Sequence, residues 1–293
     1  MEIRTLRYFM AIAREENMTR AAETLHVTQP TLSKQMQALE AELGKKLFRR
    51  HSFSIELTEE GMLLRRRAED LLSMADKIAA EFSAMDDIIG GNIYFGCAES
   101  FQIRYLARVI RHFKMQYPEF HYHITSGDTE QVTEKLDKGL LDFAVIVEQP
   151  DYEKYHVLQM PEGNRWGLIM PSGCALAQKD RIRPDDLRGL PLFCSEQGWR
   201  NDLPRWCADG MDVLRLEGSF RLAYNGAVFA REGLGYLLTF DHLVDTGPDS
   251  GLVFRPLDPP LESCMYIIWK KQQVFTPIAE RFIDELKTAF QHP

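Results

Sequence analysis

The run from residue 18 to residue 61 constrains the fold of this chain most strongly, because it predicts a short helix, a tight turn and a longer helix. Asn17 or Thr19 is expected to cap the first helix, since a small polar side chain there accepts a hydrogen bond from a free backbone N–H. Ala21 and Ala22 lie on the apolar face of this helix, so that a second helix can approach closely. Residues 26–28 form the predicted turn.

The second helix of this motif is predicted to run from about residue 28 to Gly44. Thr28 can cap it, and Pro30 fits its first turn, where a missing N–H costs nothing. Apolar residues recur at spacings of three and four and are expected to face inward: Leu32, Met36, Leu39 and Leu43. The outward face carries side chains that can reach base edges and phosphates: Gln29, Thr31, Ser33, Lys34 and Gln37. A helix of this kind can enter a DNA major groove.

Beyond Gly44 the sequence predicts a second element that contacts DNA. Two short strands, at residues 47–48 and 55–57, flank a basic loop at residues 49–52 that is able to touch a DNA backbone or minor groove. A further helix is expected before the motif, over residues 4–13. An ordinary three-helix bundle with a solvated charged face is the alternative. The agreement of polar face, caps and wing favours a winged helix-turn-helix that binds double-stranded DNA.

The same residues resemble a known family in a dense and ordered way. The matching segments are Arg-Ala-Ala-Glu at 20–23, Thr-Gln-Pro-Thr-Leu-Ser-Lys-Gln at 28–35, Leu-Glu-Ala-Glu-Leu-Gly at 39–44, Leu-Phe-Arg-Arg at 47–50 and Leu-Thr-Glu-Glu-Gly at 57–61. This stretch is similar to the amino-terminal domain of the LysR-type transcriptional regulators, which implies a sequence-specific regulator of transcription. The residues and the resemblance together predict these DNA contacts: Arg20, Thr28, Gln29, Pro30, Thr31, Ser33, Lys34, Gln37, Arg49 and Arg50.

A heptad pattern follows the motif, with apolar residues at alternating spacings of four and three: Leu64, Ala68, Leu71, Ala75, Ile78, Phe82, Met85 and Ile89. It predicts a helix over residues 59–89, capped by Thr58 and closed by Gly90 and Gly91, with a length of about 45 Å. A narrow apolar stripe on so long a helix needs a partner helix, either elsewhere in this chain or in a second copy.

A homodimer is the favoured assembly, because DNA readers with one recognition helix usually pair to read two half-sites. The resembled family also dimerises through this helix, and a tetramer is the expected larger assembly. The predicted dimer contacts are Leu64, Leu71, Ile78, Phe82 and Met85.

The charge of the chain is unevenly distributed. The net charge of −8 alone argues against a nucleic-acid binder, but residues 1–82 hold 13 basic and 13 acidic residues, so the remainder carries the whole excess of acid. The positive charge available for binding DNA is therefore confined to a local part of the chain. The amino terminus lacks the pattern of a signal peptide, and no apolar run is long enough for a membrane span. A cytoplasmic protein without a membrane partner is expected.

Residues 92 to 293 alternate strand and helix at a spacing typical of parallel βαβ units. This order resembles the two-lobed effector domain of the LysR-type family, which has the periplasmic-binding-protein fold. The predicted organisation is an α+β winged helix-turn-helix at residues 1–58, a linker helix at 59–89 and an α/β effector-binding domain at 90–293. Lobe I is expected at about 92–160 and 266–293, and lobe II at about 161–265.

Ligands of such sheets bind where strands end, and the resemblance places a small-molecule effector between the lobes. The predicted effector contacts are Ser100, Thr129, Glu148, Ser195 and Asn225. Each of them could instead serve only in helix capping or in a turn. Ser100 and Thr129 stand at helix starts, where free N–H groups favour an anion, so an anionic effector such as a carboxylate is expected. RNA polymerase is a further candidate partner.

Other functional classes are weaker. Five cysteines without a CxxC motif do not indicate a disulfide framework or a zinc site, although Cys194 and Cys207 would be the pair in a thiol redox sensor on the same scaffold. His121 and His123 share a strand face but lack a third metal ligand nearby. No nucleophile elbow, Walker loop or dinucleotide fingerprint supports an enzyme. No cofactor and no metal are expected.

Overall fold

The computed structural model describes residues 1–51, 54–84, 90–207 and 211–291. The chain divides into two compact units, Met1–Ser83 and Ala84–Pro293, and each is considered by itself. Within the described residues, every helix is too short or too polar to span a bilayer.

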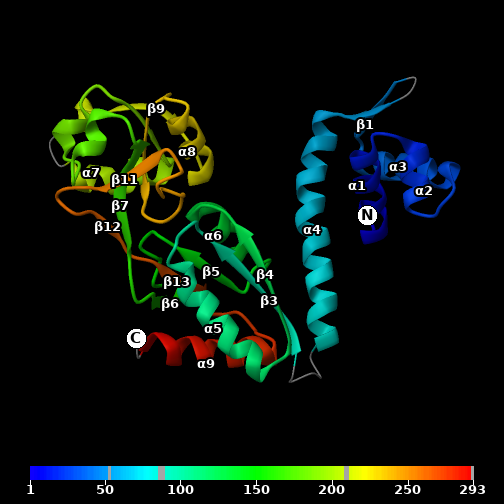
Figure 1. Cartoon of the computed structure of the whole chain (residues 1–293). Coiled ribbons are helices and arrows are strands. Elements are labelled where there is room, and N and C mark those ends of the chain that lie inside the picture. Colours follow the sequence, from blue (N-terminus) through cyan, green and yellow to red (C-terminus); the bar gives the residue numbers. More distant parts are fainter. Residues whose placement is uncertain (52–53, 85–89, 208–210, 292–293) are drawn as a thin grey trace. The chain divides into compact units, whose positions relative to one another are not determined.

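The amino-terminal unit begins with three helices, α1 (Ile3–Glu15), α2 (Met18–Thr24) and α3 (Gln29–Leu43) (Figure 1). Asn17 caps α2 as predicted, because its side chain accepts the N–H groups of Thr19 and Arg20 at 2.9 and 3.1 Å. Thr28 occupies the N-cap position of α3 but makes no capping bond, so that prediction is wrong. Its hydroxyl instead lies 2.8 Å from the hydroxyl of Thr31.

Helix α3 buries the apolar face that its periodicity predicts. Leu32, Met36 and Leu39 join the core of this unit. Leu43 is 40% exposed, however, because the last turn of α3 extends past the core, and the prediction that it faces inward is wrong. Gly44 ends the helix with φ at 65°, a conformation that favours glycine.

A two-stranded antiparallel hairpin follows, made of β1 (Phe48–Arg50) and β2 (Ile55–Leu57). It is the predicted wing. Arg49 lies in β1 rather than in the loop, where the sequence had placed it, since it pairs with Glu56 across the hairpin.

Helix α4 (Glu59–Ala84) is the longest helix of the described chain (Figure 1). Thr58 caps it, because the N–H of Gly61 donates to the Thr58 hydroxyl at 3.0 Å. Gly90 and Gly91 already belong to a strand, so they do not form the predicted helix end. Met85, one of the predicted dimer contacts, lies outside the described residues, as does Ile89.

The carboxy-terminal unit contains two sheets, each with its own core. The first sheet has the strand order β4-β3-β5-β13-β6 and forms lobe I with three helices. Its elements are β3 (Gly90–Cys97), α5 (Ile103–Gln116), β4 (Glu119–Ser126), α6 (Thr129–Asp137), β5 (Phe143–Ile146), β6 (Tyr155–Gln159), β13 (Tyr266–Lys270) and α9 (Pro277–Gln291). Strand β3 pairs in parallel with both β4 and β5, as the βαβ pattern predicts. Phe95, Phe113 and Phe282 fill the core of this lobe.

The second sheet forms lobe II with the strand order β11-β7-β10-β8-β9, and β12 pairs with β7. The strands are β7 (Asn164–Pro171), β8 (Pro191–Cys194), β9 (Arg215–Ser219), β10 (Tyr236–Phe240), β11 (Leu252–Pro256) and β12 (Glu262–Ser263). The helical segments are 3-10 turns at Ala175–Gln178, Pro184–Leu187 and Met211–Val213, a π-helix at Gly198–Asp202, α7 (Leu203–Trp206) and α8 (Ala223–Arg231). The chain enters lobe II ahead of β7 and returns to lobe I ahead of β13, so two crossings join the lobes.

Candidate functional site

The outward face of α3 carries the polar side chains predicted to contact DNA. Gln29, Pro30, Thr31, Lys34 and Gln37 are exposed, as is Thr28, and Ser33 is half-buried. The apolar side of the helix is occupied by the core, so the polar side is free to face a duplex. This is the geometry that a helix needs in order to lie in a major groove.

Three further basic residues predicted to touch DNA lie near this helix in the chain. Arg20 is exposed on α2, and its guanidinium donates to the backbone oxygen of Glu15 at 2.7 Å. Arg49 is exposed on β1. The side chain of Arg50 lies outside the described residues.

No sequence pattern indicated that Glu40 joins α3 to the wing. Its carboxylate is buried and accepts the N–H of Leu47 at 2.9 Å, the N–H of Phe48 at 3.4 Å and the ammonium of Lys46 at 2.7 Å. Burial alone would raise the pKa of Glu40, but these hydrogen bonds outweigh it and lower the pKa below its usual value. Glu40 therefore fixes the start of the wing against the recognition helix.

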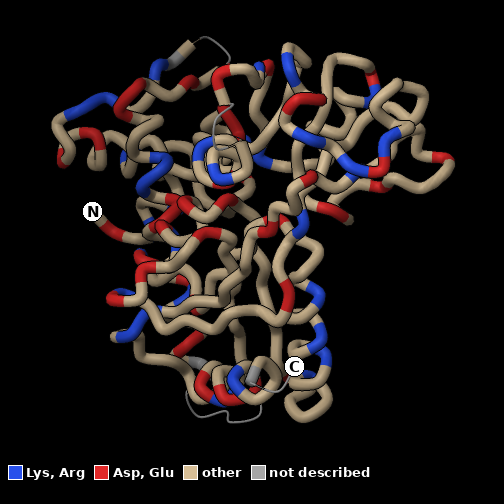
Figure 2. The backbone as a smooth tube through the Cα atoms, turned by 90° about the vertical axis from the view of Figure 1, so that its left-hand side faces the viewer, with Lys and Arg blue, Asp and Glu red and all other residues tan. Residues whose placement is uncertain are grey.

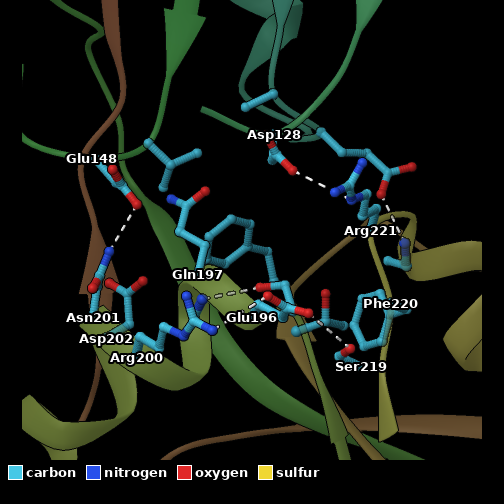
Figure 3. Close-up of a pocket in the computed structure, with 18 of the residues that line it drawn as sticks. Asp128, Glu148, Glu196, Gln197, Arg200, Asn201, Asp202, Ser219, Phe220 and Arg221 are labelled. Carbon is cyan, nitrogen blue, oxygen red and sulfur yellow. Dashed lines mark hydrogen bonds and ion pairs between the residues drawn. The ribbon is translucent and has the colours of Figure 1, made fainter. Parts of the chain in front are cut away.

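A cavity of about 500 Å³ lies between the two lobes of the carboxy-terminal unit (Figure 3). Lobe I contributes the ends of β3 and β5 and the turn before α6, and lobe II contributes the segments after β8 and β9 and the end of β10. The cavity therefore sits where strands end, which is the usual binding site of such α/β sheets. Three aromatic side chains also line it: Trp166, Phe220 and Phe240.

Three contacts cross this cavity from one lobe to the other. The Glu99 carboxylate accepts the N–H of Ala223, the first residue of α8, at 2.8 Å. The Asn201 amide donates to the Glu148 carboxylate at 2.7 Å (Figure 3). Asp128 and Arg221 form an ion pair at 3.5 Å. The angle between the lobes is therefore set partly by groups that a ligand would also meet.

The predicted effector contacts are only partly brought together. Glu148 and Ser195 line the cavity, whereas Ser100, Thr129 and Asn225 do not. Ser100 is buried beside it, where its hydroxyl donates to Asn164 at 2.5 Å. Asn225 is exposed on α8, which begins at Ala223.

The start of α6, where the sequence predicts an anion, is already capped by a carboxylate of the chain. Thr129 begins α6, but Asp128 already caps that helix by accepting the N–H of Gln131 at 2.9 Å, so a carboxylate of the chain occupies the place of the anion. The described lining residues hold six carboxylates against two guanidinium groups: Glu99, Asp128, Glu130, Glu148, Glu196 and Asp202 against Arg200 and Arg221. Acidic and basic residues are interspersed elsewhere along the chain, as Figure 2 shows. The lining of the cavity thus holds part of the acidic excess carried by the residues beyond 82.

The π-helix places three consecutive polar residues at the cavity: Arg200, Asn201 and Asp202. Its first residue must be glycine, since a Cβ at Gly198 would lie 2.3 Å from the ring of Trp166. Asp202 is held by the hydroxyl of Ser263 at 2.6 Å and by Arg205 at 2.5 Å. The wider turn of a π-helix is common at functional sites, and no sequence pattern signalled it here.

The described thiols and histidines show no activated or metal-binding arrangement. Cys194 and Cys207 are buried and unpaired; burial raises the pKa of Cys207 to about 11 and raises the pKa of Cys194 further. A reactive thiol needs the opposite shift. His123 bonds to Asn92 at 2.9 Å, and no group of three metal-binding side chains occurs among the described residues.

A winged helix-turn-helix unit followed by a two-lobed α/β unit with a cavity between its lobes defines a DNA-binding regulator with an effector-binding domain. The family model described as bacterial regulatory helix-turn-helix protein, lysR family, matches residues 3–62. The model described as LysR substrate binding domain matches residues 89–291. The chain belongs to the LysR family of transcriptional regulators.

Individual relatives agree with this assignment. The chain is 32% identical over 244 residues to a probable RuBisCO transcriptional regulator of Synechocystis, covering 80% of this chain and 70% of that protein. It is 25% identical to the transcriptional regulator YcgK of Bacillus subtilis, covering 97% and 93% of the two chains. The LysR family regulator CbnR has the same fold, with a TM-score of 0.75, 22% identity and 99% of both chains covered. A second structure, of CbnR complexed with its target DNA, has a TM-score of 0.73 at 23% identity and covers 99% of this chain and 100% of that chain.

Proposed function

We propose that this regulator binds its operator as a homodimer, and as a tetramer built from two such dimers, through α3 and the wing. The observation that supports operator binding is the exposed polar face of α3, which presents Gln29, Lys34 and Gln37 opposite an intact core. Gln29 and Ser33 are assigned to base contacts, and Lys34 to phosphate. The structure of CbnR bound to its target DNA is consistent with this mode of binding.

Dimerisation is assigned to α4. Leu71, Ile78 and Phe82 are 44%, 46% and 68% exposed on this helix, although they recur at heptad spacing. Leu64 packs against the core of the amino-terminal unit, so it contributes at most to the end of the dimer interface along α4. Exposed apolar side chains in a stripe are stabilised by a partner helix.

The cavity between the lobes is proposed to hold a small-molecule effector that controls transcription. A ligand there would contact groups from both lobes and bias their angle by its differential affinity for two arrangements. Contact with RNA polymerase and a cytoplasmic location complete the proposal.

Measurements of operator binding test the proposed DNA contacts. Binding sites mapped across the genome of the source organism would supply the cognate sequence. Gln29→Ala in the full chain is then expected to weaken cognate binding by about 1–3 kcal/mol and random DNA far less, since a base contact is lost. Lys34→Ala is expected to weaken every site and lower the salt slope by about one.

Gln35→Ala is the matched control, because Gln35 is an exposed glutamine of the same helix outside the predicted set. It should leave both affinities unchanged. If Gln29→Ala left the ratio of cognate to random binding as it is in the wild type, base readout by this end of α3 would be wrong.

A further inference from the structure

We propose that the effector of this regulator is an organic cation, a small molecule bearing an amine or a guanidinium group; this rests on the proposed role of the cavity as the effector site. The observation is the lining itself, in which carboxylates from both lobes face a single space of about 500 Å³ (Figure 3). A cavity of that size accommodates a metabolite of moderate size.

The two cationic side chains at the cavity are already matched by carboxylates. Arg221 pairs with Asp128 at 3.5 Å, and Arg200 pairs with Glu196 at 3.6 Å. An anionic ligand at either guanidinium would have to share it with that carboxylate. It would also meet the charges of the remaining acids, which repel it.

Glu148 is the lining carboxylate whose surroundings most favour a positively charged partner. It is half-buried at the end of β5, and the partner that reaches it is the neutral amide of Asn201, at 2.7 Å. Burial raises the pKa of Glu148, and the neighbouring Asp202, Asp128 and Glu130 raise it further against the effect of that amide. A ligand cation beside Glu148 would relieve this unfavourable field.

The rings at the cavity fit the same ligand class. Trp166 and Phe240 line the cavity and pack edge to face with ring centroids 4.7 Å apart, and Phe220 lies beside Arg221 (Figure 3). Aromatic faces attract organic cations, whose methylene groups also gain apolar contact there. A metal ion is a poorer occupant, because no three described metal-binding side chains come close enough together to hold one.

Calorimetry on the full chain with a matched set of probes tests whether the cavity prefers a positively charged ligand. The probes are 1,4-diaminobutane, 1,4-butanediol and succinate, which share a four-carbon skeleton and differ in charge. The diamine is expected to bind in the millimolar range or tighter, and the diol and succinate at least about tenfold more weakly.

Glu148→Gln keeps the acceptor for Asn201 and removes the charge, so it should weaken diamine binding about tenfold or more. Glu153→Gln removes an exposed carboxylate that does not line the cavity and should leave diamine binding unchanged. Mg²⁺ at the same concentration should not compete with the diamine.

The inference is overturned if succinate or the diol binds as tightly as the diamine, if the diamine does not bind at millimolar concentration, or if Glu148→Gln and Glu153→Gln behave alike. Competition by Mg²⁺ would also overturn it, in favour of an inorganic cation. Failure of the proposed function would give a different result. The wild-type chain, without any ligand, would then show no preference for the cognate operator over random DNA.

Discussion

Glu40 shows how a single buried carboxylate can couple a recognition helix to its wing. Replacing it by alanine would strand the N–H groups of Leu47 and Phe48 in the core and remove a charge-assisted bond to Lys46. Glu40→Ala is therefore expected to lower the free energy of opening of this unit by about 2 kcal/mol. Amide hydrogen exchange at Phe48 and Leu39 in the full chain would measure that loss.

The pH dependence of the same site has a definite sign. Because the folded-state pKa of Glu40 is lowered, its contribution is present above the usual carboxylate pKa and disappears as the pH falls through the lowered value. Glu40→Ala should thus differ most from the wild type near neutrality and least in acid. Glu23→Ala, at an exposed position of α2, is the control. Equal protection in both variants at neutral pH would contradict the role assigned to Glu40.

At the residue level the sequence pointed to the cavity between the lobes and selected Glu148 and Ser195, which line it, but not Glu99 and Asp128, which also line it. It pointed to the strand ends that carry Glu99–Ser100 and Asp128–Thr129, but selected the hydroxyl of each pair. In the structure the acids line the cavity, and Ser100 bonds inward to Asn164. The direction of a side chain just past a strand depends on how the strand ends against its neighbours, which periodicity does not encode.

Among the elements, α4 carries the clearest prediction about assembly. Ile78→Glu would place a charge in the exposed apolar stripe and desolvate it against a partner helix, so the dimer should weaken by at least about tenfold. Operator affinity should fall with it, although no DNA contact is changed. Analytical ultracentrifugation and a binding assay on the same samples would measure both effects.

Ser73→Glu is the matched control, because Ser73 is an exposed residue of α4 outside the heptad positions. It adds the same charge to the same helix and should leave the dimer intact. Sedimentation of Ile78→Glu as an unchanged dimer would exclude this seam.

The elements that periodicity predicted are those with a strong local signal. Helices α3 and α4 and the parallel strands of lobe I follow the expected pattern, since each has a continuous apolar face. Strands β6 and β11 and the π-helix at Gly198–Asp202 were not predicted. Short antiparallel edge strands and a single widened turn depend on contacts made across the sheet, so their local sequence is weakly informative.

In the whole molecule, the two lobes meet through groups that also line the cavity, so ligand binding and lobe angle are linked. Glu99, Glu148 and Asp128 each reach across to the other lobe. A ligand that replaces one of these contacts changes the balance between arrangements by the difference between its own interaction and the one it displaces. The net negative charge of the chain, which would repel DNA, is carried by the residues beyond 82. Some of those acidic residues line this cavity.

Substitutions at the cavity and at α3 are expected to separate the control of transcription from DNA binding. Asn201→Ala removes the lobe II partner of Glu148 and changes no residue of the amino-terminal unit. Operator affinity of the ligand-free protein should therefore stay within about threefold of the wild type, as for independent sites that share no residue. Transcription from a reporter behind the mapped operator should instead lose or invert its response, because one contact that sets the lobe angle is gone. Lys34→Ala should do the converse and weaken operator binding directly. If Asn201→Ala lowered operator affinity as much as Lys34→Ala does, the cavity and the DNA-binding unit could not be acting as separate sites.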